Sequence, residues 1–129
     1  MKKSFSLIAL LALIAAPALA GSPDLSFQNP SLIVDNYPRS VSVTARNDGT
    51  ATADDCSVTI SLPTGVSLVS GDNPQDVGSI APGGKAFATW TVHWPVCQFM
   101  QTAPVGLAIQ CTNGSHTQDT VIWCYNSPR

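Results

Sequence analysis

The residues of this chain whose side chains suit chemistry are few: four cysteines, two histidines and three tryptophans in 129 residues. General acid–base catalysis relies mostly on His, Glu and Asp, and the sequence contains no Glu. It also lacks the G-x-S-x-G turn of serine hydrolases and the G-x-x-x-x-G-K loop that binds phosphates. We therefore expect no catalytic residue, no cofactor and no enzymatic activity.

A metal site is the first alternative, because His93, Cys97 and Met100 lie close together in the sequence and His116 follows later. Thiolate, thioether and imidazole ligands of this kind suit copper. The order of these residues differs from that of cupredoxins, in which a second His lies between the Cys and the Met. No C-x₂-C pair is present to suggest zinc. We expect no metal site and keep copper only as an alternative.

Aromatic side chains provide the second alternative, a carbohydrate ligand. Exposed ring faces stack on sugars, and Trp94 and Trp123 are the candidate ligand-contact residues. Alternation along its strand places Trp90 inside the predicted core, where a large ring fills the space between two sheets. If Trp94 and Trp123 were both exposed on one flat face, a ligand-binding function would be favoured.

Residues 1–20 match a bacterial Sec-type signal peptide. Lys2 and Lys3 give a positive start, an apolar run covers residues 7–16, and Ala18-Leu19-Ala20 supplies the small residues before cleavage. The apolar run is shorter than the ~20 residues that span a bilayer. We expect export to the periplasm, the cell surface or the medium, with no membrane span after the signal is removed.

Export changes how the four cysteines are interpreted, because an even set in an oxidising compartment predicts disulfide bonds. Cys56, Cys97, Cys111 and Cys124 allow three pairings. Alternating strand directions bring Cys97 near the end of the strand that carries Cys124, which favours Cys97–Cys124. Cys56 and Cys111, both on inward faces, would then bridge the two sheets.

Short alternating runs between turn signals predict an all-β fold. In 40–46 and 56–62, apolar and hydroxyl side chains alternate, and Asn47-Asp48-Gly49 forms a turn between strands. Runs of this kind recur every ~8 to 12 residues, which is typical of an immunoglobulin-like antiparallel β-sandwich of about 7–8 strands. We expect a signal peptide at 1–20, an extended N-terminal arm at 21–30, the sandwich at 31–125 and a tail at 126–129.

One pattern between residues 41 and 94 resembles a known family. Asn47 and Gly49 are followed by Leu62-Pro63-Thr64-Gly65 and by Gly78-Ser79-Ile80-Ala81-Pro82-Gly83. In this order they resemble the Ig-like repeats of bacterial and archaeal surface proteins, which include the CARDB, DUF11 and NEW3 domains. The resemblance implies an Ig-like fold and a role as spacer, adhesion module or accessory domain, and it implies no catalytic residue.

The charge balance excludes some partners. After residue 20 the chain has four basic and eight acidic residues, so binding to nucleic acid through a basic surface is not expected. We expect a secreted, non-catalytic structural or protein-interaction module of the cell envelope. Its partner would be an envelope protein or a second copy, reached through strand edges or through residues 22–30 acting as a free pairing arm. The alternative is a periplasmic or extracellular protein that binds carbohydrate or copper.

Overall fold

The computed structural model describes residues 21–28, 30 and 32–126, and within them the chain is all-β. The predicted signal peptide at 1–20 and residues 127–129 of the predicted tail lie outside this part. The described residues contain no helix that is long and apolar enough to cross a membrane. Their strands are β1 (Leu25–Phe27), β2 (Leu32–Val34), β3 (Arg39–Asn47), β4 (Ala53–Ser61), β5 (Ser67–Ser70), β6 (Gln75–Ile80), β7 (Lys85–His93), β8 (Thr102–Cys111) and β9 (Gly114–Cys124).

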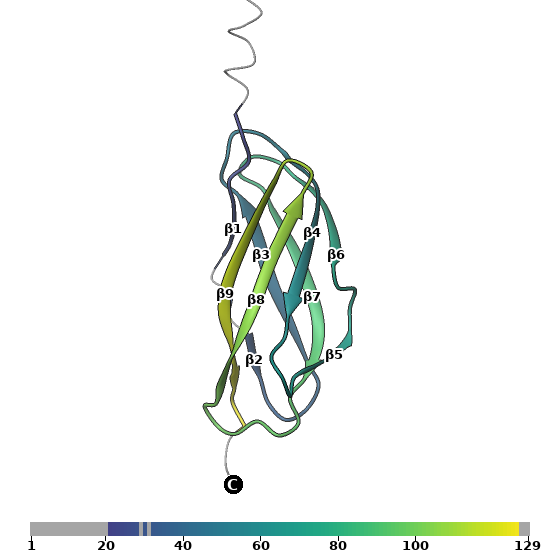
Figure 1. Cartoon of the computed structure of the whole chain (residues 1–129), viewed down its shortest axis with the longest axis vertical. Helices are drawn as coiled ribbons and strands as arrows, with labels where there is room; N and C mark the ends of the chain where they lie inside the picture. Colours follow the sequence, from purple (N-terminus) through teal and green to yellow (C-terminus); the bar gives the residue numbers. More distant parts are fainter. Residues whose placement is uncertain (1–20, 29, 31, 127–129) are drawn as a thin grey trace, which may run out of the picture.

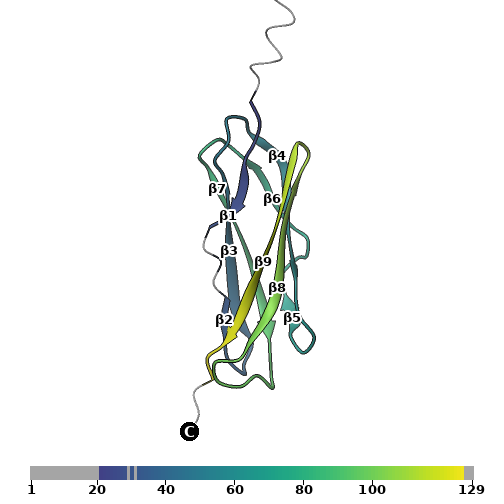
Figure 2. The same cartoon turned by 60° about the vertical axis from the view of Figure 1, so that its left-hand side comes forward.

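The strands form two sheets that face each other along the long axis of the molecule (Figures 1 and 2). Sheet A has the order β1-β3-β7-β5, and sheet B has the order β2-β9-β8-β4-β6. All described pairs are antiparallel except β2 with β9, which is parallel. The expected two-sheet all-β architecture is therefore confirmed, but sheet B is mixed rather than purely antiparallel.

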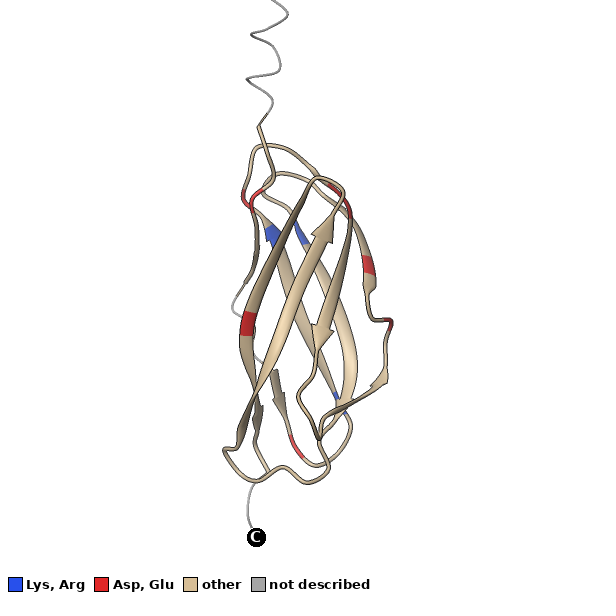
Figure 3. Cartoon of the chain, viewed as in Figure 1, with Lys and Arg blue, Asp and Glu red and all other residues tan. Residues whose placement is uncertain are grey.

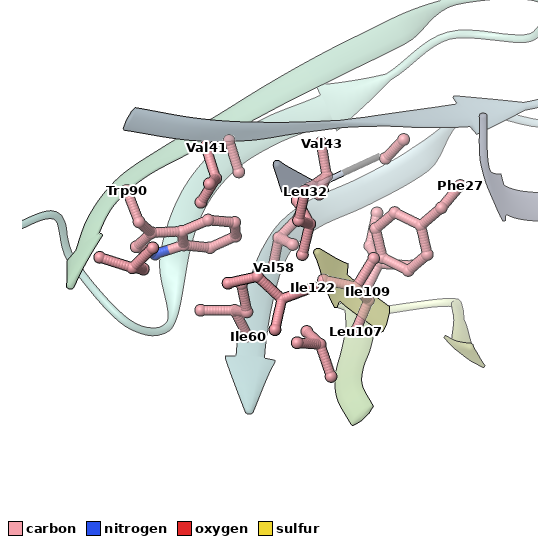
Figure 4. Packing of buried hydrophobic residues seen from close by; sticks show 14 of the residues in the cluster. Phe27, Leu32, Val41, Val43, Val58, Ile60, Trp90, Leu107, Ile109 and Ile122 are labelled. Atoms are coloured by element: carbon pink, nitrogen blue, oxygen red, sulfur yellow. The ribbon is translucent and has the colours of Figure 1, made fainter. Parts of the chain in front are cut away.

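Side chains from both sheets meet in one apolar core (Figure 4). Alternation directs Val41 and Val43 of β3 and Val58 and Ile60 of β4 inward, and each of the four is at most 5 % exposed. Trp90 of β7 is 1 % exposed, and its Nε1–H donates to the Asp72 carbonyl at 2.7 Å. The indole is thus buried with its one polar group bonded, as expected from the sequence.

The N-terminal segment is not a free arm. Residues 25–27 form β1 and pair with β3, and Leu25 and Phe27 are buried in the core. The Thr50 N–H also donates to the Ser22 carbonyl at 3.0 Å. The apolar side chains at 25 and 27 explain the difference, because their burial between the sheets holds this segment against its own domain.

Asn47 joins three segments at one end of the sandwich. It is fully buried, and its Nδ2 donates to the carbonyls of Ala51 and Ile80 at 2.8 and 2.9 Å. Its Oδ1 accepts the N–H groups of Asp24 and Gly49, both at 3.0 Å. One side chain therefore satisfies four backbone groups, which would otherwise be left without a partner.

The Cys56–Cys111 disulfide lies within sheet B. The register pairs Ser57 with Gln110, so Cys56 and Cys111 are directly opposite each other on β4 and β8. The pairing is the one that strand direction favoured, but the expectation that it bridges the two sheets is wrong. Neighbouring strands of one sheet bring opposed Cα atoms to about 4.5–5.5 Å, close enough for the two sulfurs to bond.

We predict that Asn47→Ala lowers the free energy of unfolding by about 2–4 kcal/mol, because it removes the partner of the buried Ile80 carbonyl and of three part-buried backbone groups. Asn113→Ala is the matched control. Asn113 also bridges two backbone groups, of Thr52 and Asp54, but it is exposed. We expect its loss to cost less than about 1 kcal/mol, because water replaces the lost bonds. Chemical denaturation measures both values, and equal costs would contradict this account of Asn47.

Candidate functional site

The loop between β7 and β8, residues 94–101, is held at the end of β9 by one disulfide and several hydrogen bonds. Cys97 is bonded to Cys124, the last residue of β9. The Met100 N–H donates to the Cys124 carbonyl and the Cys124 N–H donates to the Gln101 carbonyl, both at 2.8 Å. Asn36 donates its Nδ2 to the Cys97 carbonyl at 2.9 Å. The loop therefore has a defined position beside β9 and β2.

This position brings exposed apolar side chains of the loop next to those of two strands. We define the β2–β9 patch as the exposed residues Ile33, Phe99, Met100, Val121, Trp123 and Tyr125. Trp123 is the register partner of Ile33, and the outward positions of β9 continue to Val121 on one side. Beyond the strand, Tyr125 lies next to Phe99, with ring centroids 5.4 Å apart. Met100 follows Phe99 in the loop, and its N–H bonds the Cys124 carbonyl, so the six residues lie close together along β9 and the adjoining loop.

The patch is apolar at its centre, and an ion pair lies two residues beyond Ile33. The Arg39 Nη2 atom is 2.6 Å from the Asp35 Oδ2 atom. The Arg39 Cζ atom also lies over the Tyr37 ring, 5.9 Å from its centroid. The pKa of Asp35 is below its usual value, because the Arg39 side chain and the Tyr37 N–H donate to its carboxylate. Charged residues elsewhere lie mostly on loops and strand ends (Figure 3). This pair is self-neutralising, but Asp119, the next outward residue of β9 beside Val121, has no ion-pair partner among the described residues, so this side of the patch carries a negative charge.

The two predicted ligand-contact tryptophans lie in different environments. Trp123 is 39 % exposed and belongs to the β2–β9 patch, but Trp94 is only 4 % exposed and belongs to the core. The condition for a ligand platform formed by both rings, exposure of Trp94 and Trp123 on one face, is therefore not met. Trp94 continues the inward row of β7 that contains Trp90 and Val92, and this alternation explains its burial.

Sequence reasoning missed Ile33, Phe99 and Val121 as surface residues. For Val121 the signal was available, because a buried, disulfide-bonded Cys124 makes 122 and 124 the inward positions of β9. Residues 121, 123 and 125 must then point outward. Phe99 had no such signal, since it lies in a loop whose position depends on the disulfide.

The residues of the copper alternative do not form a metal site. Cys97 is disulfide-bonded, so it has no thiolate to offer. The Nε2 atom of His93 is 3.0 Å from the Asn36 carbonyl oxygen, which occupies that ring nitrogen. Within the described part of the chain, no three residues among His, Cys, Asp and Glu are grouped as metal ligands would be. The geometry thus gives the copper alternative no support.

No protein-family model and no curated protein matches the chain. Solved structures do match, among them one described as "AvmM Catalyzes Macrocyclization in Alchivemycin A Biosynthesis". It is 10 % identical, with a TM-score of 0.53, over 84 % of this chain and 91 % of that one. The secreted serine protease VesC from Vibrio cholerae is 15 % identical, with a TM-score of 0.45, over 87 % of this chain and 24 % of that one. The VesB protease from Vibrio cholerae is 15 % identical, with a TM-score of 0.43, over 79 % and 32 % of the two chains.

The first of these matches corrects the expectation that the chain is not an enzyme. That expectation rested on missing motifs and on a fold class associated with structural repeats. The matched structure with the higher TM-score is a protein that catalyses macrocyclization, according to its description. At 10 % identity the match shows a shared fold alone. Because this fold occurs in an enzyme, the fold itself does not exclude catalysis in this chain.

We predict that replacing Cys97 and Cys124 together by Ala lowers the free energy of unfolding by about 3–4 kcal/mol, because the bridge closes a loop across a sequence separation of 27. Amide hydrogen exchange should become faster at Met100 and Cys124, whose N–H groups are bonded in this region. The control is the double variant Cys56→Ala and Cys111→Ala, which should leave exchange at Met100 unchanged. Unchanged exchange at Met100 without the Cys97–Cys124 bond would show that the bridge does not position the loop.

Proposed function

We propose that this chain is an exported Ig-like binding module and that a protein of the cell envelope docks on its β2–β9 patch. The observation that carries the proposal is the patch itself: six exposed apolar side chains on one rigid surface. Large connected apolar surfaces are uncommon on monomeric soluble proteins and usually mark contacts.

The strand order supports the Ig-like part of the proposal. In a constant-type Ig domain, one sheet has the order ABED and the other contains strands C, F and G. Sheet A has the order β1-β3-β7-β5, and the centre of sheet B has the order β9-β8-β4. These correspond in chain order to A-B-E-D and G-F-C. The extra strands β2 and β6 lie at the two edges of sheet B. The proposed relation to CARDB- and DUF11-type repeats therefore includes two edge strands added to the Ig strand set.

The cysteines support the exported location. The described part of the chain has two disulfides and no free cysteine. Such bonds persist in oxidising compartments and are rare in the cytosol of most organisms. They are compatible with an extracellular or periplasmic location, which the predicted signal peptide would provide.

The composition of the patch favours a protein partner. Trp, Tyr, Phe and Met are enriched at the buried centres of protein interfaces, while Lys, Glu and Asp are depleted there. The β2–β9 patch contains each of the four enriched types and no charged residue. Its backbone is fixed by strand pairing and a disulfide, so little conformational entropy is lost when a partner binds.

Carbohydrate is the second candidate, because Trp123 and Tyr125 are exposed on the same surface. The carbohydrate alternative is less well supported by the structure than by the sequence, since the buried Trp94 does not contribute a second indole. A screen of the purified protein against a panel of glycans separates the two candidates. Saturable glycan binding that depends on Trp123 would favour carbohydrate over a protein partner.

The proposal predicts that Trp123→Ser weakens binding to an envelope protein about tenfold or more, since central aromatic side chains dominate interface energies. Phe87→Ser is the matched control, because Phe87 is an exposed aromatic residue on β7 of the other sheet. Each variant is immobilised, and the proteins captured from native envelope extract are quantified by mass spectrometry. A protein that binds the wild type and Phe87→Ser but not Trp123→Ser is the expected result. Equal capture by all three would exclude the patch as the docking site.

A further inference from the structure

Strand β9 has a long edge that no described strand covers. On one side it pairs with β8 along its whole length, from Gly114 to Trp123, without a register shift. On the other side, β2 pairs only with residues 122–124. Neighbouring β1 belongs to sheet A (Figure 2). Among residues 21–28, 30 and 32–126, the backbone of 115–121 therefore has no strand partner on this side.

Strand geometry shows which residues present their backbone to the open edge. The Tyr125 N–H donates to the Val34 carbonyl of β2, while the Cys124 N–H donates to Gln101 on the opposite side. Backbone groups of successive residues in a strand point to opposite sides. Hence the odd-numbered residues Ser115, Thr117, Asp119 and Val121 direct their N–H and C=O groups toward the open edge.

The outermost strands of the two sheets, which are β1 and β5 in sheet A and β2 and β6 in sheet B, lack such an edge. β1 and β2 have three residues each, and β5 has four. β6 is irregular, with register shifts against β4 and a left-handed backbone at Gly78. These features are common devices against unwanted strand pairing. Residues 115–121 of β9 have no Pro, no Lys and no bulge.

Side-chain amides close two further edges that would otherwise be open. Asn73 bonds both the N–H and the C=O of Ile60 on β4, at 3.0 and 2.8 Å. Gln75 bonds the N–H and the C=O of Thr89 on β7 in the same way, at 3.1 and 2.9 Å. Each amide thus takes the place of a peptide group in a neighbouring strand. Shorter stretches without a described strand partner on one side remain at 39–43 of β3, 85–88 of β7 and 102–105 of β8, and 115–121 of β9 is longer than each of them.

The side chains along this edge also differ from those of a closed core. The inward positions His116, Gln118 and Thr120 are polar and half-buried, whereas the next inward residues, Ile122 and Cys124, are fully buried. Facing them, Phe27 of β1 lies 6.1 Å from the His116 ring. The inward row of β9 beside this edge is therefore polar, in contrast to the apolar core that begins at Ile122.

The residues at the two ends of the open stretch determine whether a peptide or a second folded copy of the chain fits beside β9. At one end β2 begins, with Leu32 opposite Ile122. At the other end Pro23 lies against the hairpin, where a Cβ added to Gly114 would be 3.1 Å from its side chain. A second copy aligned antiparallel on β9 would bring its own hairpin into the space that β2 fills. A single extended segment of about seven residues, ~3.3 Å per residue, needs no such space.

We propose that the edge of β9 at residues 115–121 receives an extended peptide segment of another protein as an additional strand of sheet B. The repeating N–H and C=O groups of this edge are complementary to another peptide backbone in extended conformation. Asp119 points outward in the middle of the stretch without an ion-pair partner among the described residues. A Lys or Arg beside it on the incoming strand would supply the complementary charge. This site does not depend on the β2–β9 patch, although both use β9.

Thr117→Pro is the direct test, because it removes one N–H from the open edge and no hydrogen bond to β8. Pro104 already occupies a position of this kind on β8, opposite Val121. Thr117→Ala, which keeps the N–H, is the matched control. The probe is a phage-displayed library of nine-residue peptides selected on the wild-type protein. We expect peptides that bind wild type and Thr117→Ala alike but bind Thr117→Pro about tenfold more weakly.

Hydrogen exchange on the wild-type protein keeps the test decisive if Thr117→Pro does not fold. With a selected peptide bound, the amides of Thr117, Asp119 and Val121 should be protected, and Asp119→Lys should weaken the binding of peptides that contain Lys or Arg. Three results would overturn the proposal. The first is that the library yields no binding peptide, and the second is that Thr117→Pro and Asp119→Lys both bind the selected peptides as the wild type does. The third is that a bound peptide slows amide exchange only in strands other than β9. Dimerisation of the chain that Thr117→Pro abolishes would assign the edge to a second copy instead. Trp123→Ser should leave peptide binding unchanged, so failure of the docking patch and failure of this edge are distinguishable.

Discussion

The covalent bond between Cys97 and Cys124 determines what one end of the molecule presents to its surroundings. Without it, residues 94–101 would be a connection between β7 and β8 held by a few hydrogen bonds. With it, and with the Asn36 amide on the Cys97 carbonyl, Phe99 and Met100 are held beside the last residues of β9. The side chain of Phe99 in the loop then contacts Tyr125, the first residue after β9, close to the register partners Trp123 and Ile33. Rigid placement of this kind favours binding, because the ordering cost is met on folding rather than on association.

Side-chain amides bond to backbone N–H and C=O groups that have no strand partner elsewhere in the molecule. Asn47 satisfies four backbone groups where the N-terminal segment, the turn after β3 and the last residue of β6 meet. Asn73 and Gln75 replace missing strand partners on β4 and β7. A chain with few charged residues has few charges with which to protect its strand edges, and these amides take that role. Residues 115–121 of β9 are the longest stretch of described backbone without a partner on one side, and the β2–β9 patch groups six of the exposed apolar side chains.

Much of the core could be predicted from the sequence, because strand alternation has a period of two and needs no tertiary information. The inward rows of β3, β4 and β7 follow directly from the positions of Val41, Val58 and Trp90. Strand neighbours could not be predicted in this way. That β4 lies next to β8, and thus that Cys56 and Cys111 face each other within one sheet, depends on how the chain crosses between the layers. The same limit applies to β1 and β2, which join different sheets although only residues 28–31 separate them. The residues of the candidate site differed in how far the sequence could predict them. Trp123 was predicted from its residue type, whereas the exposure of Phe99 depends on the position of its loop. Trp94 was also predicted as a contact residue, but it is buried in the core.

Site-specific photo-crosslinking in the native cell envelope tests the central claim most directly. A photoreactive amino acid is placed at position 123 within the β2–β9 patch or, for comparison, at position 87 on the outer face of sheet A. The account predicts one dominant crosslinked protein from position 123 and no crosslink to that protein from position 87. Crosslinks to the same protein from both positions, or from position 87 alone, would contradict the assignment of the patch as the docking surface.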